Sequence, residues 1–288
     1  MYNTIVFSIN VFESKDEKDR WGNNKLNYYY LKEQILNIKY NTTDFTEVYV
    51  ILNCNDRIFD RLQNEPLYDN KIKIIINPEI INKQRFTGTL THGIFSNLKY
   101  IVENKIIFDY FIVISSRNFF KTKISMEIIN NRMIHTKTKW LEMSKLNKKF
   151  FHNSNYYHYK VCEKTMEHEC SEPIPDWYFN DNRIKETKWF DKFKNDFELI
   201  IGGKHEALCF TNIVIKNMYN YMINNNETME EIYNNKCCVE EIVLQTLGYN
   251  LINNKEDISF TFLPELIKFG RNIDKLDKLK LHNKKFEK

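Results

Sequence analysis

Two adjacent glutamates, Glu240 and Glu241, stand at the start of the apolar run CCVEEIVLQTLGYN, residues 237–250. Acidic side chains in the first turn of a helix are favoured by the helix dipole, which is one explanation for the pair. The other explanation is catalysis, because a carboxylate placed against a substrate hydroxyl can accept its proton. Neighbouring helix residues point about 100° apart, so only one of the two can face a cleft. Glu241 is our candidate base and Glu240 the alternate.

A further pair of candidate residues, the imidazole of His205 and the carboxylate of Glu206, follows the Gly-Gly turn of ELIIGGKHEALCFT. Such a pair is either structural or a site of proton transfer and hydrogen bonding. We keep Glu206 as a rival base and His205 as a candidate acceptor contact. Trp177 and Tyr178, in PIPDWYF, are candidates to stack on a sugar face, with burial in the core as the alternative.

The elements that must position these residues alternate between strand and helix in the first part of the chain. Apolar runs predict strands at 4–10, 47–56, 71–78 and 108–116, and helical spacing predicts helices at 26–40 and 91–104. This order predicts a single-domain α/β fold with a Rossmann-like, mainly parallel central sheet flanked by helices. Ligands of such sheets bind at the carboxyl ends of the strands. The polar candidates for ligand contact at those ends are Asn10, Asn53, Ser116, Arg117 and Asn118.

The later part of the chain has weaker periodicity. Residues 121–200 are rich in aromatic and polar side chains, and we interpret them as loops and short helices around a pocket. Residues 198–223 predict two short strands around the Gly-Gly turn and a helix that begins near Thr211. A helix at 239–248, a last strand in ISFTFLPELIKF and a charged terminal helix complete the prediction.

Composition excludes several classes of protein. The net charge of +4 is too mild to indicate a nucleic-acid partner, and 42% hydrophobic residues are typical of a folded chain. No apolar run approaches 18 residues, and the N-terminal stretch MYNTIVFSINVFES lacks the pattern of a signal peptide, so we expect no membrane span. Most of the six cysteines lie beside apolar segments, which favours inert thiols in a reducing, cytoplasmic setting.

Common cofactor and metal motifs are not found in the sequence. The cysteines and histidines of YYHYKVCEKTMEHEC, residues 156–170, match the spacing of no common zinc module. The chain contains no Gly-x-Gly-x-x-Gly run after its first strand, no phosphate-binding loop and no Gly-x-Ser-x-Gly elbow. These observations count against dinucleotide-dependent enzymes and serine hydrolases.

The order of three segments resembles that of the core-2 and I-branching glucosaminyltransferases and peptide O-xylosyltransferases. The stretch THGIFSNLKYIVENKIIFDYFIVISSRNFF is similar to their helix and strand that end in a Leu-Ser-x-x-Asp-like sequence. GGKHEALCFT occupies the place of their Gly-Ser-x-x-Phe strand. CVEEIVLQT occupies the place of their Pro-Asp-Glu helix start, with Glu241 five residues before the threonine. The resemblance spans residues 4–272 and lies in the order and pattern of the segments. The amino-acid sequence of each motif differs from that of the family.

The resemblance implies a GT-A type, inverting glycosyltransferase that moves a sugar from a nucleotide-sugar donor, with uridine diphosphate as the expected nucleotide, to a glycan acceptor. It implies no cofactor and no divalent metal, because that family stabilises the leaving diphosphate with C-terminal basic side chains. Lys268 and Arg271 take that place here, with ordinary surface charges as the alternative. The strand end SSRNFF carries no acidic residue that could hold a metal.

The resemblance also divides the single domain into two halves. Residues 1–120 would bind the nucleotide-sugar, and residues 121–288 would bind the acceptor and carry the catalytic base. The expected location is the cytoplasm, or the host cytoplasm for a viral chain. Two alternatives stay open: another nucleotide-dependent transferase on the same sheet, and a glycan-binding protein without catalysis.

Overall fold

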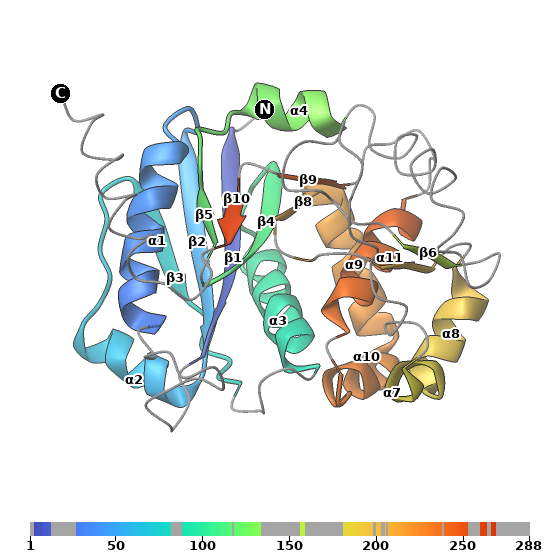
Figure 1. The fold of residues 1–288 in the computed structure, drawn as a ribbon. Helices are drawn as coiled ribbons and strands as arrows, with labels where there is room; N and C mark the ends of the chain where they lie inside the picture. Colours follow the sequence, from blue (N-terminus) through green and yellow to red (C-terminus); the bar gives the residue numbers. More distant parts are fainter. Residues whose placement is uncertain are drawn as a thin grey trace.

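The computed structural model describes residues 3–12, 27–81, 88–116, 118–133, 156–158, 181–197, 200–202, 205, 207–237, 239–252, 260–263 and 266–268. Its centre is a six-stranded sheet in the order β3-β2-β1-β4-β8-β9 (Figure 1). The strands of this sheet are β1 (Thr4–Val11), β2 (Glu47–Cys54), β3 (Ile72–Ile76), β4 (Tyr110–Ser115), β8 (Leu208–Thr211) and β9 (Phe260–Phe262). Four neighbouring strands, β3 to β4, run parallel, while β8 and β9 are antiparallel to their neighbours. The expected α/β, mainly parallel, Rossmann-like sheet is therefore confirmed.

Helices surround this sheet, and two short strand pairs lie beside it. The helices are α1 (Asn27–Asn41), α2 (Asp56–Asn64), α3 (Thr89–Glu103), α4 (Met126–Met133), α7 (Asn182–Lys185), α8 (Lys188–Asp196), α9 (Asn212–Asn224), α10 (Asn226–Tyr233) and α11 (Glu240–Asn250). The strand pairs are β5 (Asn118–Phe120) with β10 (Leu266–Lys268), and β6 (Tyr156–His158) with β7 (Ile200–Gly202). No helix in the described part of the chain is long and apolar enough to cross a membrane.

The strand order places helices on both faces of the sheet. The chain moves outward from β1 to β3 and then returns past β1 to β4. Because crossovers between parallel strands are right-handed, α1 and α2 cover one face and α3 covers the other. Side chains of β1 alternate accordingly: Phe7 packs edge-on against Phe120, while Ser8 accepts a hydrogen bond from Asn97 of α3.

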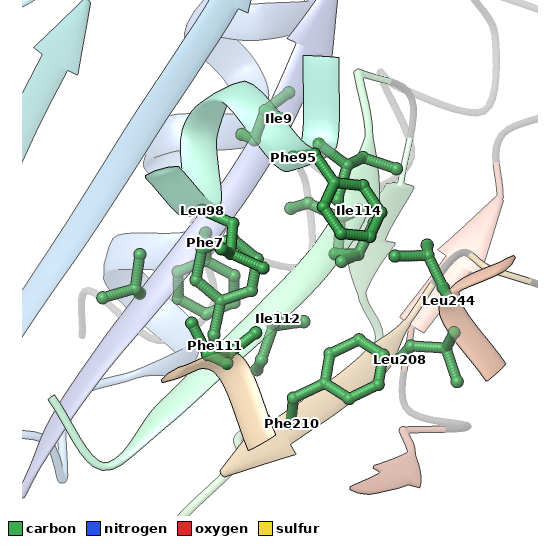
Figure 2. Packing of buried hydrophobic residues seen from close by; sticks show 14 of the residues in the cluster. Phe7, Ile9, Phe95, Leu98, Phe111, Ile112, Ile114, Leu208, Phe210 and Leu244 are labelled. Carbon is green, nitrogen blue, oxygen red and sulfur yellow. The ribbon is translucent and has the colours of Figure 1, made fainter. Parts of the chain in front are cut away.

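The core is continuous across both halves of the chain. Buried side chains of β1, β4 and α3 adjoin those of β8 and α11, among them Leu208, Phe210 and Leu244 (Figure 2). This continuity agrees with a single hydrophobic core for the main sheet and its helices. The cysteines that the structure describes, Cys54, Cys209 and Cys237, are buried, as expected from their apolar neighbours.

Several boundaries differ from those predicted. The second strand ends at Cys54, because Asn55 caps α2 by accepting a hydrogen bond from the Ile58 amide. Two helices, α2 of nine residues and α10 of eight, were not predicted from the sequence. Thr211 caps α9 as predicted, its hydroxyl accepting from the Val214 amide. The segment considered for zinc lies outside the described residues apart from the backbone of β6, and the terminal helix lies wholly outside them.

Candidate active site at the carboxyl edge of the sheet

Two predicted positions, Asn10 and Asn53, lie side by side at the carboxyl edge of the parallel strands, next to the strand end that leads to Ser116. Asn10 at the end of β1 is in register with Asn53 of β2 on one side and with Ser115 of β4 on the other. The strand order reverses between β1 and β4, and ligands of open α/β sheets bind in the crevice at such a reversal. The candidate site therefore lies beyond the ends of β1 and β4.

The amide side chains at this edge shape the loops. Asn10 donates to the Leu90 carbonyl at 3.0 Å, and Asn53 donates to the Glu79 carbonyl at 2.8 Å. Both side chains are buried, so they fix the start of α3 and the segment after β3. The two side chains thus hold neighbouring backbone in place at this edge.

The turn after β4 is held in the same way. The Asn118 side-chain oxygen accepts from the Ser115 amide at 2.7 Å, and Asn118 is buried. Gln34 of α1 donates to the carbonyls of Ser115 and Asn118 at 2.8 and 2.6 Å. Ser116, at the tip of this turn, is partly exposed and is thus available to a ligand.

The predicted acidic pair and the predicted histidine meet at this edge. His205 Nδ1 lies 3.7 Å from Glu240 Oε1 and 3.6 Å from Glu241 Oε1. These separations are longer than hydrogen bonds, and they place both carboxylates beside the same imidazole nitrogen. The side chain of Glu240 is 3% exposed, that of Glu241 is 17% exposed and that of His205 is 12% exposed. Glu241 is therefore the carboxylate more open to a ligand.

The antiparallel direction of β8 brings His205 to this edge. The Ala207 amide donates to the Val113 carbonyl at 2.7 Å, which attaches the start of β8 to the end of β4. Ala207 has φ of 75°, a left-handed conformation that residues with a side chain rarely adopt. Such strain costs on the order of 1–3 kcal/mol and is concentrated at functional sites. This turn sets the position of His205, two residues earlier.

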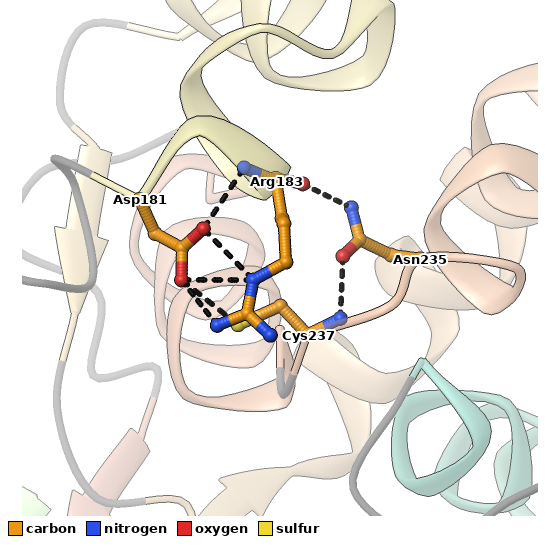
Figure 3. A network of polar contacts seen from close by, with 4 residues as sticks. All are labelled: Asp181, Arg183, Asn235 and Cys237. Carbon is orange, nitrogen blue, oxygen red and sulfur yellow. Dashed lines mark hydrogen bonds and ion pairs between the residues drawn. The ribbon is translucent and has the colours of Figure 1, made fainter.

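The acidic pair is positioned by the connector between α10 and α11, residues 234–239. Asn235 is buried in it, donates to the Arg183 carbonyl at 2.9 Å and accepts from the Cys237 amide at 2.8 Å (Figure 3). Arg183 also pairs with Asp181, whose carboxylate accepts a hydrogen bond from the Cys237 thiol. These contacts fix the connector against α7 directly before Glu240.

The start of α3 holds the other side of the connector. The Gly88 amide donates to the Asn235 carbonyl at 2.8 Å. An added Cβ at Gly88 would lie 2.0 Å from the Ile232 carbonyl oxygen and 2.7 Å from that of Tyr233. Only glycine permits this approach, so α3 and α10 meet backbone to backbone beside the site.

The remaining predicted residues are placed only in part. Lys268 is the register partner of Asn118, so the backbone of β10 lies beside the turn after β4. The other predicted residues lie outside the described part of the chain: Glu206, Arg117, Arg271, Trp177 and Tyr178.

A second polar cluster at the same edge was not predicted. Glu79, three residues after β3, receives hydrogen bonds from His92 at 3.0 Å and from Ser96 at 2.8 Å. The His92 ring stacks on Tyr233 of α10, with ring centroids 4.4 Å apart. The hydrogen bond from His92, followed by that from Ser96, lowers the pKa of Glu79 to about 2 against the cost of partial burial. Its carboxylate is ionised across the physiological range.

This shift makes part of the stability depend on pH. The pKa of Glu79 is lower in the folded chain than its ordinary value of 4.5, so its contribution is fully present above about pH 4.5 and is lost as the pH falls towards 2. Glu79→Gln should therefore be less stable than the parent chain at pH 7, and the difference should shrink below pH 4. Urea unfolding of both chains at pH 7, 5 and 3 measures this, and a gap independent of pH would contradict it.

Comparisons with known proteins assign this chain to no family. No family model and no curated protein matches the chain. Two solved structures of HddC from Yersinia pseudotuberculosis, one of them complexed with GMP-PN, align over 42% of this chain and 49% of HddC. Their identities are 17% and 18%, and the TM-score is 0.22 in both cases. The chain thus matches about half the length of HddC, and this likeness is too low to carry an argument about function.

Proposed function

We propose that the chain is an inverting glycosyltransferase that transfers a sugar from a nucleotide-sugar to a glycan acceptor without a divalent metal. The observation that carries the proposal is the meeting of His205, Glu240 and Glu241 at the carboxyl edge of the sheet. Ligands of α/β sheets bind at this edge, and an inverting transfer needs one carboxylate there to take the acceptor proton.

Glu241 is the proposed base. Its side chain is partly exposed, whereas that of Glu240 is almost fully buried beside the same imidazole nitrogen. Burying a carboxylate is costly unless a donor or a positive charge lies near it. Glu240 therefore supports the His205 imidazole, and Glu241 faces the acceptor. Glu206 is the rival base.

The chemistry of the transfer follows from these positions. The acceptor oxygen forms a bond to the anomeric carbon while its proton passes to Glu241 and the bond to the nucleoside diphosphate breaks on the opposite face. The leaving diphosphate gains negative charge, which fixed cations can stabilise. Lys268 and Arg271 are the proposed cations, and Ser116 and Arg117 are further proposed contacts to the nucleotide-sugar.

The two halves of the chain then have different roles. Residues 1–120 form the donor side of the edge, and residues 121–288 supply the base and the acceptor contacts. Trp177 and Tyr178 are the proposed stacking residues for the acceptor sugar. The proposed setting is the cytoplasm, and the expected nucleotide is uridine diphosphate.

Nucleotide binding tests the proposal directly. Calorimetry with uridine, guanosine and cytidine diphosphates and their sugars, each with and without a chelator, should show one preferred nucleotide whose affinity survives chelation. Affinity that requires manganese or magnesium would overturn the metal-independent mechanism. If none of these nucleotides binds, the chain is a glycan-binding protein or uses another substrate.

A further inference from the structure

The carboxylate of Glu79 is fixed in place and still open to solvent. His92 donates to Oε1 and Ser96 donates to Oε2, while the side chain remains 42% exposed. An ionised carboxylate offers about four lone pairs, and these two hydrogen bonds use one on each oxygen. One acceptor direction on each oxygen is left for a ligand with two neighbouring donors.

The residues that hold Glu79 in place lie next to the candidate active site. Asn53, in register with Asn10 at the sheet edge, donates to the Glu79 carbonyl. His92 stacks on Tyr233, which ends α10 directly before the connector that leads to Glu240. The two polar clusters therefore lie at the same edge of the sheet and are linked by one short stretch of chain.

We propose that Glu79 accepts hydrogen bonds from the 2′ and 3′ hydroxyls of the donor's ribose. The inference rests on the proposed function and adds to it the recognition of a ribonucleotide. Two hydroxyls on adjacent carbons match the two open acceptor directions of one carboxylate. A phosphate in this place would be repelled by the ionised side chain.

The position of Glu79 along the sheet edge is compatible with binding the ribose of the donor. The ends of β3 and β4 are separated by three strand spacings, roughly 14 Å at about 4.8 Å each. A ribose held after β3 leaves the diphosphate to run past β2 and β1 towards the turn after β4. The transferred sugar then lies near His205 and Glu241, which border β4 from β8 and α11.

The test compares ribonucleotides with their 2′-deoxy forms. Calorimetry on the full chain should show that the preferred nucleoside diphosphate binds about tenfold or more tightly than its 2′-deoxy form, because a hydrogen bond to a charged group is lost. Glu79→Gln should reduce this preference to about twofold by weakening only the ribonucleotide. Glu227→Gln, which removes an exposed acid from α10, should keep the full preference.

The outcomes separate this inference from the proposed function. The role of Glu79 would be overturned if the parent chain bound the ribonucleotide and its 2′-deoxy form equally well. It would also be overturned if Glu79→Gln kept the full preference for the ribonucleotide. Nucleotide binding itself would stand in both cases. Failure of the parent chain to bind any of these nucleotides would overturn both. The comparison in the parent chain needs no variant, so it holds even where Glu79→Gln folds poorly.

Discussion

Glu241→Gln should slow sugar transfer by about 100-fold or more while nucleotide-sugar binding stays within a factor of two of the parent chain. Glutamine keeps the size of the side chain but cannot take the acceptor proton. The loss of a positioned general base typically lowers the rate by 10²- to 10⁴-fold. Nucleotide release with an acceptor glycan measures the rate, and calorimetry with the nucleotide-sugar measures binding.

The neighbouring acid provides the matched comparison. Glu240→Gln alters a buried carboxylate beside His205, so we expect lower stability together with partial activity. If Glu240→Gln were inactive and Glu241→Gln active, the two roles would be exchanged. Full transfer activity in both variants would remove the acidic pair from the mechanism and favour Glu206.

Gly88→Ala should destabilise the fold by about 3 kcal/mol or more, at the upper end of the range for overpacked sites. The backbone of Gly88 has φ of −52°, which alanine adopts without strain, so the effect comes from space alone. The added carbon would meet the carbonyl oxygens of Ile232 and Tyr233, which cannot rotate away. Urea unfolding monitored by circular dichroism measures the change in the free energy of unfolding.

Gly93→Ala is the control for this prediction. An added Cβ there would lie 2.6 Å from Asn10 Oδ1, a side-chain atom that can move. We therefore expect a smaller loss of stability than at Gly88, together with a displaced Asn10. Equal stability of Gly88→Ala and the parent chain would show that α3 and α10 can separate at this contact without cost.

The sequence was sufficient to predict the parallel part of the sheet. Its strands are apolar runs rich in β-branched residues, which is typical of strands buried on both faces. The direction of β8 could not be predicted, because a short apolar run does not encode its orientation. The helix α2 was missed because it buries only Ile58 and Leu62, too few apolar positions for a clear period.

The candidate site was predictable only in part. The helix that begins at Glu240 is visible in the sequence, but the exposure that distinguishes Glu240 from Glu241 arises from packing against His205. Glu79 and His92 were missed because they are 13 positions apart and meet only when α3 packs over β1 and β2. Asn53 stays a predicted ligand contact, and its hydrogen bond to the remote Glu79 carbonyl could not be predicted because it forms only in the fold.

The antiparallel pairing of β4 with β8 has a consequence for biosynthesis. β4 ends at Ser115, and the strand that covers its outer edge begins at Leu208. At about 5–20 residues per second, a ribosome makes the intervening chain in roughly 5–20 seconds. During that interval the apolar edge of β4 has no strand from β8 to pair with, and an open strand edge readily pairs with other chains. Slow translation or truncation between these two strands should therefore favour aggregation of the nascent protein.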